Sequence, residues 1–146
     1  MSLPGFRPSC VAIGVLYVLL AGSFLLRGPM VAMAAYGVAP ETLASPHYAD
    51  AMSWVFLHML VLGLIIAVVG WFAEGVRLQR AFVRLMLLTL LVYTYLDVRT
   101  ADWPLGDALY KGPASLGPVI VDALALVLWL RLNLVRTVPA RRPPGR

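Results

Sequence analysis

The chain has 146 residues, of which 61% are hydrophobic and 13% charged, with a mean hydropathy of +0.84. Soluble domains are about 45–50% apolar and about 25% charged, and a domain of this size has too little interior to bury the excess. The composition therefore excludes an ordinary soluble protein and indicates an integral membrane protein. The net charge of +5 does not indicate a nucleic-acid partner, because the basic residues gather at the ends of apolar segments, where they set membrane topology.

Four apolar segments approach or exceed the roughly 20 helical residues that cross a bilayer. We expect spans at about 10–33, 51–73, 81–96 and 114–130. The first apolar run reaches Arg27, and we expect its helix to continue past Gly28 with a kink at Pro29. A cleaved signal peptide is the alternative for this segment, but Arg27 and Pro29 stand between the apolar run and the small residues at 32–34.

These spans predict an all-α fold, an integral membrane four-helix bundle. Residues 1–136 form a single four-span domain, and the Arg/Pro-rich residues 137–146 form a disordered cytoplasmic tail. By the positive-inside rule, both termini lie in the cytoplasm. The basic residues that indicate this precede the first span, join the second span to the third, and lie in the tail: Arg7, Arg77, Arg80, Arg84, Arg141, Arg142 and Arg146. We therefore expect a multi-pass protein of the cell (inner or plasma) membrane.

Polar side chains gather in the outer half of the predicted bundle. His58 lies eight residues after Asp50 and Asp122 eight residues after Ala114, so both lie about 12 Å below the outer ends of their spans. We expect them to face each other as catalytic residues, with His58 exchanging a proton and Asp122 orienting it. Ionisable groups within a membrane are functional candidates because they are costly to place there.

The same outer half supplies candidate ligand-binding residues. Tyr93 and Asp97 are four residues apart and share a helix face, and Arg27 near the end of the first span is suited to an anionic or carbonyl group. The competing interpretation is structural: interhelical hydrogen bonds and an Arg27–Asp97 ion pair would hold the bundle together. The sequence leaves both interpretations open.

Metal and redox sites find little support. Cys10 is the only cysteine, which excludes an internal disulfide and a cysteine zinc site. Only one histidine lies within a span, so a bis-histidine haem is not expected. A copper site is an alternative, because four methionines lie near His47 and His58: Met30, Met33, Met52 and Met59. Methionines in apolar spans usually serve packing. We predict no metal and name no cofactor.

The layout resembles the small four-helix membrane proteins of the DoxX-like group. The resemblance rests on Ala21-Gly22-Ser23 in the first span, Arg27 near its end, a polar outer loop and three further spans. It implies a membrane location, and the named member of that group is associated with quinone-linked electron transfer. No motif here carries over a catalytic residue.

Two functions fit these observations. One is a small-ligand protein that holds a quinone- or isoprenoid-like molecule in the outer polar pocket. The alternative is a non-catalytic accessory or scaffold subunit of a larger membrane complex. Whether the chain is an enzyme stays open, and the expected partners are the lipid bilayer, a lipid-soluble small molecule, and another membrane protein or a second copy of the chain.

Overall fold

The structure is a computed structural model that describes residues 3–107 and 110–135. Its long helices are α1 (Phe6–Arg27), α4 (Pro46–Phe72), α5 (Val76–Thr100) and α6 (Gly117–Leu134), the last preceded by the 3-10 turn η1 (Pro113–Leu116). Counting η1 with α6, the four spans have 22, 27, 25 and 22 residues and are apolar enough to cross a bilayer. The prediction of an all-α membrane protein with four spanning helices is confirmed. The predicted tail at 137–146 lies outside the described residues.

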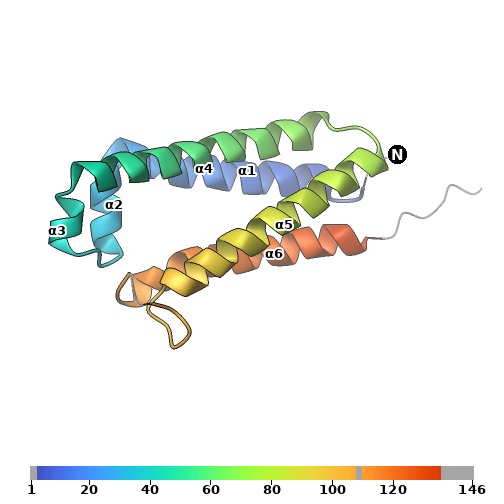
Figure 1. Cartoon of the computed structure of the whole chain (residues 1–146). Helices are drawn as coiled ribbons and strands as arrows, with labels where there is room; N and C mark the ends of the chain where they lie inside the picture. The colour runs from blue at the N-terminus through green and yellow to red at the C-terminus, as the bar shows by residue number, and fades with distance from the viewer. Residues whose placement is uncertain (1–2, 108–109, 136–146) are drawn as a thin grey trace, which may run out of the picture.

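The first span departs from the expected kinked helix. α1 ends at Arg27, and Gly28 takes a φ of +92°, a conformation that suits glycine because it lacks a Cβ. Pro29 then starts a separate short helix, α2 (Pro29–Ala35), as proline favours a first helical position. Figure 1 shows α2 running across the end of α1 rather than continuing its axis. A second short helix, α3 (Pro40–Leu43), leads into α4.

The four long helices are arranged as two antiparallel pairs (Figure 1). α1 packs along α4 and α5 packs along α6, whereas the two pairs touch each other at few positions. A short turn at 73–75 joins α4 to α5. We call the end that holds Leu3 and this turn the terminal end, and the opposite end, with α2, α3 and the 101–116 connection, the loop end.

The α1–α4 pair is held at short range by glycine. A Cβ added at Gly14 would lie 2.6 Å from the carbonyl oxygen of Gly63, and one added at Gly63 would lie 2.8 Å from that of Gly14. In lipid, where no hydrophobic effect drives helices together, small residues let backbones approach and gain van der Waals contact. This contact fixes how α1 presents Tyr17, three residues further along, toward the other pair.

An aromatic cluster closes the terminal end. The ring of Phe82 in α5 packs edge-on against Phe6 of α1 and Trp129 of α6, with centroid distances of 6.3 and 6.0 Å. Val83 and Leu132 complete the cluster and are buried together with Phe6 and Trp129. Edge-to-face aromatic contacts of this kind add to the stability that their buried area provides. Here they join three of the four long helices.

Gln79 is a buried polar side chain within this end. It is completely buried, accepts a hydrogen bond from the Leu3 backbone N–H (2.6 Å) and donates one to the Ala73 carbonyl (2.9 Å). Both backbone groups lie outside helices, so they lack the partners that helical groups have. The amide thereby ties the N-terminal segment and the α4–α5 turn to the start of α5.

The loop end connects the two pairs a second time. The Lys111 backbone N–H donates to the Tyr36 carbonyl at 3.0 Å, and the Tyr36 and Tyr110 rings lie 6.5 Å apart. At Gly37, with a φ of +72°, a Cβ would lie 2.7 Å from the Lys111 oxygen. The helix pairs are therefore linked at both ends, and the space between them lies in the middle of the molecule.

Candidate functional site

Two carboxyl groups meet between α5 and α6 near the loop end. Asp122 of α6 is only 7% exposed and accepts a hydrogen bond from the Thr94 hydroxyl, with 3.4 Å between the oxygens. The carboxyl group of Asp97 on α5 lies within hydrogen-bonding reach of Asp122. An ionised carboxylate only accepts hydrogen bonds, so a direct hydrogen bond between the two groups requires that one of them carries a proton, as in other close carboxyl pairs.

Two tyrosines stand beside this carboxyl pair. Tyr17 of α1, which is 7% exposed, lies within electrostatic range of Asp122, Asp97 and Tyr93. Tyr93 precedes Asp97 by one helical turn on α5, so the two residues share a face. The site thus contains hydroxyl donors and carboxyl groups from three helices, α1, α5 and α6.

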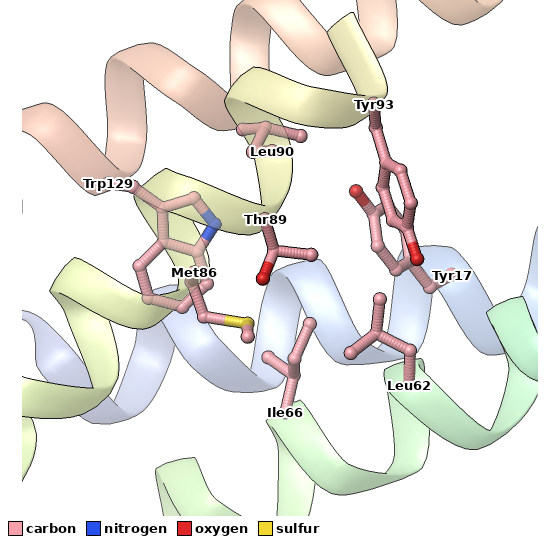
Figure 2. Close-up of a pocket in the computed structure, with 8 residues that line it drawn as sticks. All are labelled: Tyr17, Leu62, Ile66, Met86, Thr89, Leu90, Tyr93 and Trp129. Carbon is pink, nitrogen blue, oxygen red and sulfur yellow. The ribbon is translucent and has the colours of Figure 1, made fainter. Parts of the chain in front are cut away.

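A cleft between the two helix pairs adjoins the tyrosines (Figure 2). Figure 2 shows Tyr17, Thr89 and Tyr93 bringing hydroxyl groups to an otherwise apolar lining. The apolar lining comes from α4, α5 and α6: Leu62, Ile66, Met86, Leu90 and Trp129. The volume open to the centre of a water molecule is about 10 Å³, about the minimum that a single water needs.

Three of the five predicted site residues come together. Tyr93 lines the cleft, and Asp97 and Asp122 form the carboxyl pair. In the sequence they were predicted from their depth within the spans and from their spacing along a helix. In the structure, α5 packs antiparallel to α6, which brings the two carboxyl groups to one level. Their catalytic or ligand-binding roles stay predictions.

The structure does not bring His58 to Asp122. His58 is exposed on α4, where its Nδ1 lies 2.7 Å from the Trp54 carbonyl oxygen of the preceding turn. The buried face of α4 is defined by Phe56 and by Gly63 against α1. His58 lies two residues after Phe56, which is about 200° around the helix. It therefore faces the surroundings, and Asp122 takes its partners from α5.

Arg27 also lies outside the site. It is exposed at the end of α1, because the chain turns at Gly28 instead of continuing as a helix. Over residues 3–107 and 110–135 the one ion pair joins Arg99 to Asp107 (3.0 Å), on the exposed surface. The expected Arg27–Asp97 ion pair is thus not formed.

Sequence reasoning overlooked Tyr17, Thr89 and Thr94. Each lies in an apolar span, where tyrosine and threonine are common without a ligand to bind. Thr94 carried a usable signal, since it stands three residues before Asp97 and so on the same helix face. Nothing in the spacing of Tyr17 indicated that α1 would turn it toward α5.

The described part of the chain contains no group of three or more histidine, cysteine, aspartate or glutamate side chains that could hold a metal ion. Of the methionines considered for copper, Met33 is buried in a second core cluster with Val38 and Phe56. Its sulfur accepts a hydrogen bond from the Tyr48 hydroxyl at 3.4 Å. Met33 therefore has a packing role that needs no metal.

Comparisons with protein-family models, curated proteins and solved structures find no match to this chain.

Proposed function

We propose that the protein binds a small lipid-soluble molecule, quinone- or isoprenoid-like, in the cleft between its helix pairs. The observation that carries the proposal is the carboxyl pair Asp97–Asp122, held in an apolar bundle near a cleft that contains the hydroxyl groups of Tyr17, Thr89 and Tyr93. Placing a carboxyl group within a membrane is unfavourable, and such groups usually mark a ligand or proton pathway. Packing alone would be served as well by an apolar pair.

The direction of entry follows from the helix arrangement. α4 and α5 are consecutive yet diverge from their shared turn (Figure 1), and each supplies residues to the cleft lining, such as Leu62 and Thr89. A lipid-soluble molecule therefore reaches the cleft sideways, from the bilayer, between α4 and α5. The cleft volume of about 10 Å³ admits one water, so the helix pairs must separate further to hold a ring-sized ligand.

The chemistry of the lining favours a ligand that carries a carbonyl or hydroxyl group. The shared proton of the carboxyl pair can be donated to a carbonyl oxygen, and its negative charge can accept a hydrogen bond from a ligand hydroxyl. Tyr17 and Tyr93 offer further donors beside it. The apolar part of the ligand would lie against Leu62, Ile66 and the bilayer. A quinone ring and an isoprenoid alcohol both meet these requirements, and a quinone also agrees with the DoxX-like resemblance.

Trp129 supplies a direct test, because it lines the cleft and quinones quench indole fluorescence. The three exposed tryptophans, Trp54, Trp71 and Trp103, are first replaced by phenylalanine, so that Trp129 alone reports in every variant. The purified protein in nanodiscs is titrated with a short-chain quinone, and the quenching is compared with that of Asp122→Leu and of His58→Leu. We expect Asp122→Leu to weaken binding by about 2–10-fold, the range of one lost hydrogen bond. His58→Leu, a change of similar size at the same predicted depth but on the exposed face, should bind as the unmodified protein does. Equal binding by all three would contradict the proposal.

A non-catalytic accessory subunit is the second candidate, favoured by the small volume of the cleft. In that case the cleft stays closed, the polar cluster holds α5 to α6, and an outward apolar face contacts another membrane protein. Large exposed side chains are available for such contact on every long helix, Leu19, Leu64, Leu88 and Leu124 among them. Quenching that does not saturate in the titration above, together with a partner that copurifies in fixed ratio, would establish this function instead.

A further inference from the structure

We infer that the carboxyl pair exchanges its proton with water at the loop end of the molecule alone, because the terminal end is closed by an aromatic seal. The inference rests on the proposed function, since it assigns a side to the proton that a bound ligand would take up or release. Beyond that function, we infer that the ligand carries a carbonyl or hydroxyl group that gains or loses a proton. We also infer that this proton is exchanged with the compartment on one side of the membrane.

The loop end offers a short polar route to the pair. Asp97 stands three residues before the end of α5 at Thr100, so it lies about 4.5 Å along the axis from the helix end. It is half-buried, whereas Asp122 is 7% exposed. Asp97 is therefore the member of the pair that water reaches first, and Asp122 is the more buried member.

Tyr36 extends this route beyond the membrane-spanning helices. It lies in the connection between α2 and α3. Burial raises the pKa of its phenol, and the nearby negative charge of Asp97 raises it further. Tyr36 thus lies within electrostatic range of Asp97 and holds its hydroxyl proton at neutral pH. A neutral phenol in the loop-end connection is able to donate and accept a hydrogen bond near Asp97.

The terminal end has the opposite character. About 20 Å of α5 separates the cleft residue Thr89 from the start of the helix at Val76. Along this stretch Phe82 packs between Phe6 and Trp129. Among the described residues, Gln79 is the fully buried polar side chain at this end, with both amide atoms bonded to the backbone. The half-buried Arg80 beside it donates to the Val135 carbonyl at the end of α6, although its Nε is buried without a partner. Between Gln79 and Thr89 the part of α5 that packs in the seal places no buried polar side chain there, so a proton has no stepwise path through it.

The charges that face Asp122 agree with a single exchangeable proton. α5 presents Asp97 and Thr94 to it, and α1 places Tyr17 within electrostatic range. On α6 itself the nearest charged residue is Arg131, nine residues on, about 13.5 Å along the axis. Over the described residues neither carboxyl group is in an ion pair, since the one recorded ion pair joins Arg99 to Asp107, and His58 faces outward. Nothing permanently neutralises the pair, so its charge depends on the proton.

A carbodiimide experiment tests the sidedness. Dicyclohexylcarbodiimide enters from the bilayer and reacts with protonated carboxyl groups: the carboxyl oxygen bonds to the central carbon, the proton moves to nitrogen, and rearrangement gives a stable N-acylurea. The full-length protein is reconstituted in vesicles, and the pH of each compartment is set separately at about pH 6 or about pH 9, on either side of neutrality. Labelling of Asp122 is then measured by peptide mass spectrometry, with Asp122→Asn as the blank.

The orientation of the vesicles is determined independently. Leu105→Cys, 78% exposed in the loop-end connection, and Glu74→Cys, exposed in the α4–α5 turn, report the two ends with a membrane-impermeant maleimide. The native Cys10 is completely buried and should not react. The same pair of variants tests the predicted orientation in cells, where Leu105→Cys should react from outside.

We expect alkaline pH at the loop end to reduce labelling of Asp122 by up to about tenfold per pH unit above the midpoint of its titration, and alkaline pH at the terminal end to leave it unchanged. Phe82→Ala should make labelling respond to both compartments, whereas Phe82→Leu, which keeps an apolar side chain in the seal, should not. Labelling of the unmodified protein that follows the terminal-end pH, or that is absent at every pH, would overturn the inference. If labelling follows the loop-end pH but an added quinone does not protect Asp122, the proton route stands and the quinone proposal fails.

Discussion

The contact between Gly14 and Gly63 leads to a sharp prediction about the α1–α4 pair. In Gly14→Ala the new Cβ would lie 2.6 Å from the Gly63 carbonyl oxygen and 2.8 Å from the backbone nitrogen of Ala67. These are backbone atoms of α4 and cannot rotate away. Restoring an ordinary separation of about 3.5 Å, the usual distance for non-bonded contact, requires the helices to move apart by several tenths of an ångström to about 1 Å. A gap of that size forfeits a quarter to a half of each contact's attraction.

Overpacking of this kind costs about 1–3 kcal/mol, while the change from glycine to alanine within a helix gains up to about 1 kcal/mol. Gly22 on the same helix separates the two effects, because a Cβ added there meets nothing within 4 Å. Gly22→Ala receives the helical gain without the clash. We therefore expect Gly14→Ala to be about 1–3 kcal/mol less stable than Gly22→Ala.

Thermal unfolding in detergent, followed by circular dichroism, measures the difference as a fall of several degrees in the midpoint. Because α1 also positions Tyr17, the same variant should weaken quinone quenching of Trp129, whereas Gly22→Ala should not. Equal unfolding temperatures for the two alanine variants would refute the close approach of α1 and α4, and with it the assignment of Tyr17 to the cleft.

Three further substitutions each test one contact or placement described above. Gln79→Leu removes the hydrogen bonds to Leu3 and Ala73 and leaves two backbone groups without partners, so we expect a loss of about 1–3 kcal/mol in unfolding free energy; unchanged stability would mean that this end is hydrated. Asp122→Leu should unfold at a lower temperature than Asp122→Asn, since the amide keeps a hydrogen bond to α5 and leucine does not; the reverse order would argue against the carboxyl pair. His58→Leu should change stability by less than about 0.5 kcal/mol in the same assay, because the side chain is exposed; a loss of more than 1 kcal/mol, well beyond that surface range, would place His58 in the interior.

The number of spanning helices and their approximate positions followed from the sequence for a physical reason. A backbone in hydrocarbon must satisfy its hydrogen bonds within the segment, so an apolar run of sufficient length has little choice but to be a helix. The same argument singled out Asp97 and Asp122, because carboxyl groups in such runs are few. Helical spacing added Tyr93, which does line the cleft.

Only the tertiary structure decided how each helix is rotated about its axis. A helix that is apolar all round has no polar face to turn outward, so depth alone suggested that His58 and Asp122 would meet, and the packing of Phe56 and Gly63 against α1 turned His58 away instead. The pairing of α1 with α4 depends likewise on two glycines whose partners are distant in sequence. The end of α1 at Arg27 depends on the conformation of Gly28, which glycine permits but does not require. Length and polarity act along the chain and can be predicted from it, whereas the inward face of a helix is set by contacts with its neighbours.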